Sequence, residues 1–114
     1  MGELKTCERI EIGISYDSDI DLAKKIMQEE CENHPLILDN RSELDIQDGK
    51  PIVKTAVTQL NDSSVTIRAW TWGKDYSDSF QLKVDVLESI KKRFDKEGVE
   101  IPFPYRTIVM KKNI

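Results

Sequence analysis

The spacing of apolar residues constrains the fold of this chain more than any other feature of its sequence. In the segment RIEIGIS, Ile10, Ile12 and Ile14 occupy alternate positions, which is the period of a half-buried strand. In the next segment, DIDLAKKIMQEEC, apolar residues recur every three or four positions, which is the period of an amphipathic helix. The change from one period to the other predicts a domain that mixes strands with helices.

Two amphipathic helices are predicted from this spacing. The apolar stripe of the first consists of Ile20, Ala23, Met27 and Cys31, with Leu22 and Ile26 beside it. The apolar stripe of the second consists of Phe80, Val84, Leu87, Ile90 and Phe94. A stripe of this kind faces a core, so both helices are expected to pack on a sheet.

The remaining segments complete the predicted order β-α-β-β-α-β. Segments 52–60 and 65–72 favour strands and are separated by the turn residues of 61–64, which predicts a hairpin. Residues 33–50 are predicted to be a long loop, and residues 105–110 a short last strand. The predicted fold class is α+β, a ferredoxin-like two-layer sandwich with two helices on one face of a four-stranded antiparallel sheet. We expect one domain over 1–114, with its first strand at 10–15.

Composition and charge bound the function. The chain has 114 residues, enough for one domain at ~100–200 residues per domain, and a net charge of −4 at pH 7. A nucleic-acid binder needs surplus Lys and Arg to displace counterions from phosphates, so no nucleic-acid partner is expected. No stretch resembles a signal peptide or approaches the ~20 apolar residues of a membrane helix, which predicts a soluble piece. Cys7 and Cys31 form no disulfide framework or zinc motif, and both are expected to be reduced.

The alternating aspartates Asp17, Asp19 and Asp21 resemble the start of an EF-hand calcium loop. Such a loop also needs glycine at its position 6 and glutamate at its position 12, where this chain has Leu22 and Gln28. The aspartates are therefore interpreted as a helix N-terminus, where acidic groups offset the helix dipole.

The ends of both helices are predicted from capping residues. Ser18 is expected to cap the first helix, and Ser77 or Asp78 the second. Gly98 is well placed to end the second helix. His34 precedes a proline and is expected to mark the end of the first helix.

No pattern in the sequence predicts catalysis. His34, the only histidine, has no metal ligand at a suitable spacing, and no nucleophile elbow, Cys-His pair or C-x-x-C motif is present. The basic run 91–93 is interpreted as a solvated face near a helix C-terminus. We therefore expect no catalytic, cofactor-binding or metal-binding residues, and a protein that is not an enzyme.

Segment 65–72 places different residues on its two faces. Its aliphatic residues share one face, whereas Arg68, Trp70 and Trp72 share the other, which is open if helices cover only one side of the sheet. Trp and Arg are favoured at protein interfaces, so these three residues are a candidate subunit interface. Two alternatives stay open: the rings merely cover the sheet, or they stack on nucleic-acid bases. The second is disfavoured because the segment lacks the RNA-recognition strand motif.

The chain resembles the C-terminal cytoplasmic domain of the small-conductance mechanosensitive channels, the MscS family. The resemblance covers 9–110 in three blocks, which read IEIGISYDSDIDLAKKIM, LNDSSVTIRAWTW and DVLESIKKRFDKEGVEIPFPYRTIVM. YDSDID after an alternating strand and EIPFPYRT after a Gly-ended helix are the most specific pieces. The chain departs from the family in the loop LDNRSELDIQDGKP, which is longer than the family's L-x-D-P-x-P and lacks its first proline.

This resemblance implies a cytoplasmic vestibule and assembly domain of a homoheptameric channel in the inner membrane. Such channels open under membrane tension in hypo-osmotic shock and release ions and small solutes. Transmembrane helices and a β-domain would precede this domain, and both are absent from this chain. The cage formed by seven such domains would lie on the cytoplasmic side, and no cofactor is implied.

The resemblance also assigns a role to the last strand. In the family, the final strand of each subunit joins a seven-stranded parallel barrel, and the matching residues here are Tyr105, Arg106, Thr107, Ile108, Val109 and Met110. A lone strand is not stable in water, and closing seven copies into a ring removes every free edge. On this interpretation 9–104 is the α/β body, and 105–110 projects to neighbouring subunits instead of completing the sheet.

A second function stays open, a free-standing ferredoxin-like regulatory module that binds a small ligand between subunits. It would be a compact dimer whose melting temperature shifts with ligand. A small enzyme on this fold is disfavoured because no nucleophile, base or metal cluster is evident.

Overall fold

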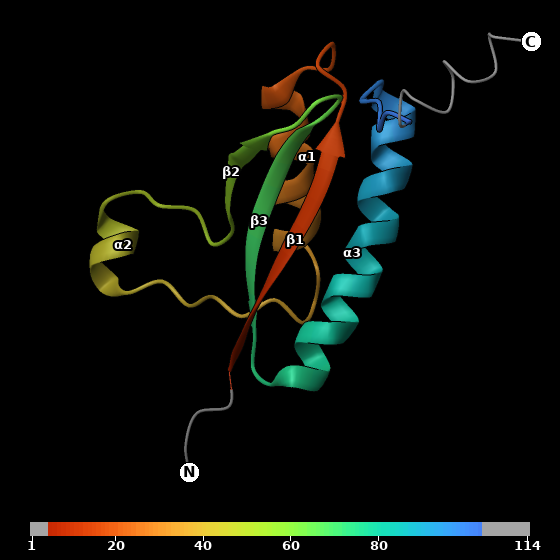
Figure 1. Ribbon diagram of the computed structural model, residues 1–114. Helices are drawn as coiled ribbons and strands as arrows, with labels where there is room; N and C mark the ends of the chain where they lie inside the picture. Colours follow the sequence, from red (N-terminus) through yellow and green to blue (C-terminus); the bar gives the residue numbers. More distant parts are fainter. Residues whose placement is uncertain (1–4, 104–114) are drawn as a thin grey trace, which may run out of the picture.

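Three antiparallel strands form one sheet in residues 5–103, the part of the chain described by this computed structural model. Strand β1 covers Thr6–Ile14, β2 covers Lys54–Leu60 and β3 covers Val65–Gly73. The strand order is β1-β3-β2, so β3 lies in the centre and pairs with both neighbours (Figure 1). The hairpin of β2 and β3 is as predicted. The predicted strand at 105–110 lies outside the described residues, so the four-stranded ferredoxin-like sheet stays a prediction.

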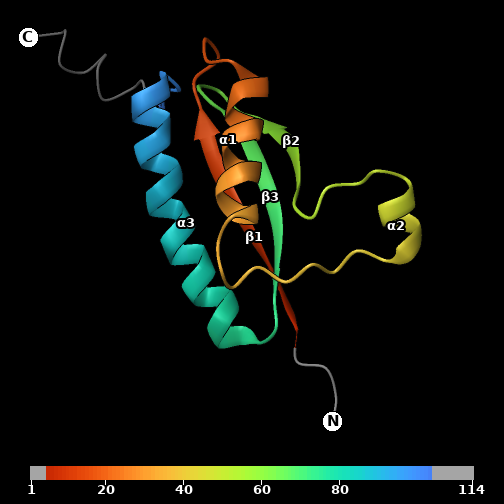
Figure 2. The ribbon, with the colours of Figure 1, turned by 180° about the vertical axis from the view of Figure 1, so that it is seen from behind.

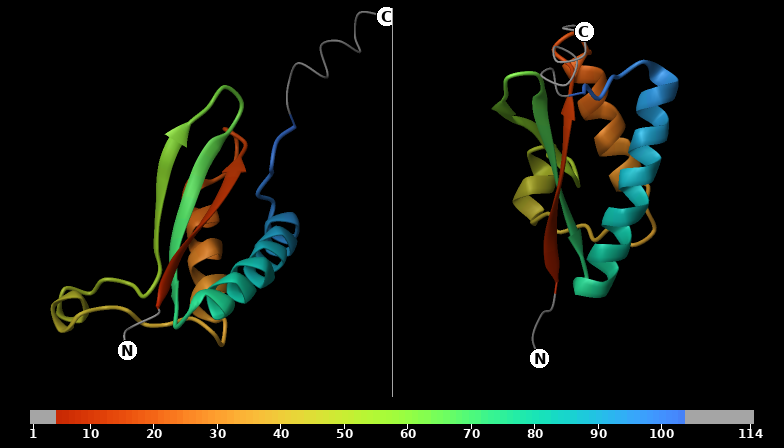
Figure 3. Two further views of the ribbon diagram at one scale, coloured as in Figure 1. Left: turned by 60° about the horizontal axis from the view of Figure 1, so that its bottom comes forward. Right: turned by 45° about the vertical axis from the view of Figure 1, so that its right-hand side comes forward.

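Helices α1 (Ile20–Glu32) and α3 (Tyr76–Glu97) lie together on one face of the sheet, as Figure 2 shows from behind. Strands and long helices therefore form two layers, which confirms the predicted α+β class. A short helix, α2 (Glu43–Gln47), lies in the connection between α1 and β2. This connection extends from the sheet on the side away from α1 and α3 (Figure 3, left).

The core lies between the sheet and the two long helices. Across β1 and β3, Ile10 faces Ala69 and Ile14 faces Val65, and all four are buried. The alternation predicted for these strands is therefore confirmed. From α1 the buried residues are Ala23, Ile26, Met27 and Cys31. Ile20 was expected on this stripe but is 39% exposed, because it is the first residue of the helix and lies at the end of the sheet.

The buried stripe of α3 differs from the predicted one. The apolar residues that face the core are Leu82, Val86, Ile90 and Phe94, each four positions from the next. Phe80, Val84 and Leu87 of the predicted stripe are 50%, 39% and 37% exposed. The helix carries two apolar stripes at helical spacing, and only its placement on the sheet decides which of them is buried.

Both predicted N-caps were wrong. Asp19 caps α1 by accepting a hydrogen bond from Leu22 N. The hydroxyl of Ser18 instead accepts a hydrogen bond from Glu100 N at 2.9 Å, which ties the start of α1 to the segment that follows α3. Asp75 caps α3, so the helix begins before Ser77.

The C-terminus of α3 is as predicted. Gly98 adopts the left-handed conformation with φ 88°, and its N–H donates to Phe94 O. Glycine carries no Cβ and adopts this conformation without the steric cost that other residues incur.

The connection 33–50 was predicted to be a loop, and this was wrong for its central part. Ser42 and Asp45 form a reciprocal capping box that starts α2. Strand β2 begins at Lys54, later than predicted, because Val53 N donates to the Glu32 carboxylate instead of to a strand. Strand β1 begins earlier than predicted, at Thr6, because β3 is long enough to pair with it up to Gly73.

Candidate functional site

The open face of the sheet is the candidate site, and it carries the three residues predicted to share it. Arg68, Trp70 and Trp72 are half-buried on the face away from the helices, while the residues between them are buried on the helix side. The register places Trp70 between Arg9 of β1 and Lys54 of β2. The predicted separation of the two faces of β3 is therefore confirmed.

Cations surround Trp70. The Nζ atom of Lys54 lies 5.2 Å from the centroid of the Trp70 ring, and the guanidinium carbon of Arg68 lies 5.4 Å from it. At these distances the ring quadrupole attracts both charges. Arg68 also donates to the Glu11 carboxylate at 2.6 Å, so its charge is balanced. Lys54 has no ion-pair partner within residues 5–103.

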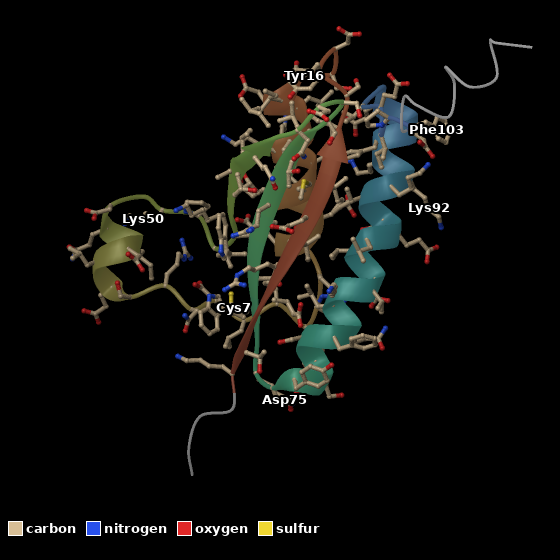
Figure 4. All side chains as sticks on the ribbon, in the orientation of Figure 1. Cys7, Tyr16, Lys50, Asp75, Lys92 and Phe103 are labelled. Atoms are coloured by element: carbon tan, nitrogen blue, oxygen red, sulfur yellow. The ribbon has the colours of Figure 1, made fainter. Side chains whose placement is uncertain are left out.

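A pocket of about 680 Å³ lies between this face and the connection from α1 to β2. Trp70, Trp72 and Ile52 contribute apolar surface to it. Its basic lining residues are Arg41, Lys50 and Lys54. Figure 4 labels two residues that line it from opposite sides, Lys50 on the connection and Cys7 on the sheet.

The connection is held against the sheet by hydrogen bonds. Leu38 N donates to Trp72 O at 2.8 Å, and Lys5 Nζ donates to Asn40 Oδ1 at 2.8 Å. The Arg41 guanidinium donates to both carboxylate oxygens of Asp39, at 2.9 and 2.8 Å, and to Lys50 O. These bonds fix the outer wall of the pocket.

Hydrogen bonds from Arg41 shift the titration of its partner. They lower the pKa of Asp39 from 3.8 to about 2. In turn, the hydrogen bond to Asp39 raises the pKa of Arg41. The pair therefore stays charged at neutral pH and keeps this part of the connection in place.

A second pocket, of about 440 Å³, lies beside the first at the edge formed by α1 and β2. Pro51 and Lys54 line both pockets. Lys24 and Lys25 of α1 and Asp21 also line the second pocket. The sequence did not predict this site, because the lysines come from segments that only the fold brings together.

The two cysteines are poor nucleophiles. Burial raises the pKa of the Cys31 thiol to about 12, and burial also raises the pKa of Cys7. A thiol with a raised pKa holds little thiolate at neutral pH. Both cysteines are free, and no cluster of three or more metal-binding side chains occurs within residues 5–103.

His34 lies just after α1, as predicted, and it also contacts α3. Its Nε2 atom lies 2.8 Å from Asp85 Oδ2, and its Nδ1 atom accepts a hydrogen bond from Leu36 N at 3.1 Å. The hydrogen bond with His34 lowers the pKa of Asp85. The contact joins the connection to α3, which sequence spacing could not indicate.

The basic run 91–93 is only partly a solvated face. Lys91 and Lys92 form exposed ion pairs within α3. Arg93 instead bridges the two long helices by donating to Glu29 and Glu30 of α1 and to Glu97 of its own helix. These hydrogen bonds raise the pKa of Arg93.

Fold and site together define a class, a small α+β domain with helices on one face of its sheet and a charged, aromatic open face on the other. Residues 8–101 match the sequence model of the family described as mechanosensitive ion channel MscS, C-terminal. The chain therefore belongs to the MscS family.

Relatives and a solved structure agree with this assignment. The chain is 34% identical over 99 residues to an uncharacterized MscS family protein of Synechocystis, covering 85% of this chain and 29% of the relative. It is 28% identical over 107 residues to the small-conductance mechanosensitive channel MscMJ of Methanocaldococcus jannaschii, covering 90% of this chain and 27% of the relative. The crystal structure of Helicobacter pylori MscS in its closed state matches with a TM-score of 0.65 and 28% identity, covering 85% of this chain and 35% of that one.

The chain thus spans about a third of the length of these proteins. Over residues 5–103, none of the helices combines the length and the apolar character that crossing a bilayer requires. Whether a neighbouring subunit contacts Arg68, Trp70 and Trp72 stays a prediction. The predicted barrel strand, Tyr105 to Met110, lies outside the described residues.

Proposed function

We propose that this domain forms part of the cytoplasmic vestibule of a mechanosensitive channel and helps to assemble it. The whole channel releases ions and small solutes when hypo-osmotic shock stretches the membrane. The observation that carries the proposal is the family match over 8–101, in a chain that spans about a third of its channel relatives. The remaining two thirds of such a protein would supply the transmembrane helices and the pore.

The proposed assembly is a homoheptamer in the inner (plasma) membrane, with this domain on the cytoplasmic side. In it, segment 105–110 of each subunit joins a shared barrel, and Arg68, Trp70 and Trp72 contact a neighbour. A second apolar stripe on α3 supports association between copies, because Tyr76, Phe80, Val84 and Leu87 are exposed. Their helical spacing places them on one side of the helix, and a large exposed apolar patch marks an interaction site.

The alternative of a free-standing, ligand-binding regulatory module is not favoured. The relatives named for their activity are mechanosensitive channels, and the matched region covers only 27–35% of each. A catalytic role is not favoured either, because these relatives are channels and not enzymes.

The full-length gene provides the test. Expressed in a bacterial strain that lacks its own mechanosensitive channels, it should restore survival of hypo-osmotic shock, and membrane patches should show tension-activated currents. Failure of both, with the protein present in the membrane, would overturn the proposal. The sequence upstream of this chain is a cheaper first test, because a start codon with no membrane-length apolar segments before the domain would also overturn it.

A further inference from the structure

Most basic side chains in the described part of the chain are paired with a carboxylate. The ion pairs involve Arg41, Lys50, Arg68, Lys74, Lys83, Lys91, Lys92 and Arg93. Within residues 5–103, the basic side chains without an ion pair are Lys5, Arg9, Lys24, Lys25, Lys54 and Lys96. In a chain with a net charge of −4, such unpaired cations are informative where they gather.

Three of these unpaired lysines gather at one place. Lys24, Lys25 and Lys54 line the pocket of about 440 Å³ at the edge of α1 and β2. Asp21 is the one acidic residue in this lining, and Gln28 and Thr55 add uncharged polar groups. The lining therefore has a surplus of positive charge and hydrogen-bond donors, which suits a phosphate or another multivalent anion.

The neighbouring pocket adds an aromatic surface. Lys54 and Pro51 line both pockets, so the lysine cluster adjoins the pocket lined by Trp70 and Trp72. Lys54 and Arg68 lie over the Trp70 ring. Within residues 5–103 the half-buried Trp72 makes no ring-stacking or cation–π contact, and it lines the pocket, where a planar group could stack on it. In this pocket the carboxylate of Asp45 lies 3.7 Å from Lys50 Nζ, so it adds little free negative charge.

We infer that the two adjoining pockets bind a small anion that carries a planar ring, the chemistry of a nucleoside phosphate. The ring stacks on Trp72, and the phosphates lie against Lys54, Lys24 and Lys25. The pocket volumes lie within the range of small-molecule sites, roughly 300–1,000 Å³. The inference concerns the isolated domain and does not depend on the channel function proposed above.

Tryptophan fluorescence gives a direct readout, because the chain has two tryptophans and both line the site. The probes are ADP, inorganic pyrophosphate and adenosine, each titrated into the 114-residue chain with calorimetry as a second measurement. ADP should bind about tenfold more tightly than either pyrophosphate or adenosine, because it alone engages both pockets. Its affinity should fall as salt is raised, because salt screens the lysine charges.

Substitutions separate the two parts of the site. Lys54→Gln and Lys24→Gln should weaken the binding of ADP and of pyrophosphate about tenfold without affecting the binding of adenosine. Trp72→Leu should reduce the affinity for ADP to the affinity for pyrophosphate. Lys96→Gln is the matched control, because Lys96 is also unpaired but lies on α3 and lines neither pocket.

Four outcomes would overturn the inference. The first is that ADP does not bind at millimolar concentration, and the second is that ADP and adenosine bind with equal affinity. The third is that Lys96→Gln lowers the affinity for ADP as much as Lys54→Gln does. The fourth is that a single-stranded oligonucleotide binds more tightly than ADP. Lys54 is exposed and Lys24 is half-buried, and neither side chain forms a hydrogen bond or ion pair within residues 5–103, so their variants keep the test valid if Trp72→Leu fails to fold.

Discussion

Gly73 shows how one residue sets the approach of two elements. It ends β3 just before α3, and a Cβ built there would lie 2.4 Å from Ser79 Oγ and 2.9 Å from Ser79 N. The backbone nitrogen cannot rotate away as a side chain can, so the position requires glycine for space and not for its backbone angles.

The substitution Gly73→Ala should therefore destabilise the domain by about 1–3 kcal/mol, the usual cost of forcing extra volume into a packed site. Urea unfolding followed by circular dichroism would measure the free energy of unfolding. Gly13→Ala is the matched control, because its Cβ would meet only the Ser64 side chain, at 3.2 and 3.3 Å. An equal loss of free energy of unfolding in both variants would contradict the explanation.

Asp39 and Arg41 give a prediction about pH. The pKa of Asp39 is lowered to about 2, so its folded-state pKa lies below its unfolded value of ~3.9. The contribution of this pair to stability is complete above the unfolded pKa and is lost as the pH falls toward 2. In Arg41→Met, an NMR titration of the carboxyl should return the pKa of Asp39 toward 3.8.

Asp45 is the internal control for that titration. Hydrogen bonds with Ser42 and the nearby Lys50 charge lower its pKa, and these causes do not include a hydrogen bond from Arg41. Its pKa should therefore stay lowered in Arg41→Met. If Asp39 kept its full pKa shift in Arg41→Met, the Arg41 side chain would not be the main cause.

Helix α3 presents two apolar stripes, and only one of them stabilises the fold. Ile90 is fully buried, whereas Val84 is 39% exposed. Ile90→Ala should cost about 2–5 kcal/mol in the free energy of unfolding, because it leaves a cavity in the core. Val84→Ala should change stability by about 0.5 kcal/mol or less in the monomer. Chemical denaturation of both variants would test the assignment, and a similar cost for both would refute it.

The N-cap of α3 distinguishes the observed helix start from the predicted one. Asp75 Oδ1 accepts a hydrogen bond from Asp78 N at 2.9 Å. Asp75→Ala should therefore lower the free energy of unfolding by about 1 kcal/mol, a typical value for a lost cap. Ser77 is exposed on the first turn, and Ser77→Ala should have almost no effect on the thermal melting temperature. If Ser77→Ala were the more damaging change, the helix would begin where the sequence alone suggested.

These elements show what sequence patterns can and cannot determine here. Strict alternation in β1 and β3 predicted which face is buried, because a strand has only two faces. In α3 two stripes fit the helical period equally well, and the choice depended on contacts with the sheet. The capping box of Ser42 and Asp45 was visible in the sequence as S-E-L-D, whereas the gathering of Lys24 and Lys54 needed the folded chain.

At the level of the whole molecule, the two proposed places for segment 105–110 are a fourth strand in the sheet of its own domain and a barrel shared between subunits. Val109→Pro removes a backbone N–H that either structure would use. In the full-length protein it should lower the fraction of heptamer seen by native mass spectrometry. In the 114-residue chain it should leave the melting temperature unchanged. Global unfolding of that chain would instead place the segment in the sheet of its own domain.

The ring of His34 connects distant parts of the molecule through one particular tautomer. Leu36 N can only donate, so Nδ1 must be the bare nitrogen, and the single proton of the neutral ring lies on Nε2, directed at Asp85. The two ends of the imidazole thus have separate roles, one accepting from a turn and the other donating to α3. Asparagine could imitate only the first role and glutamine only the second, so no other uncharged side chain can join both partners across 51 positions of sequence.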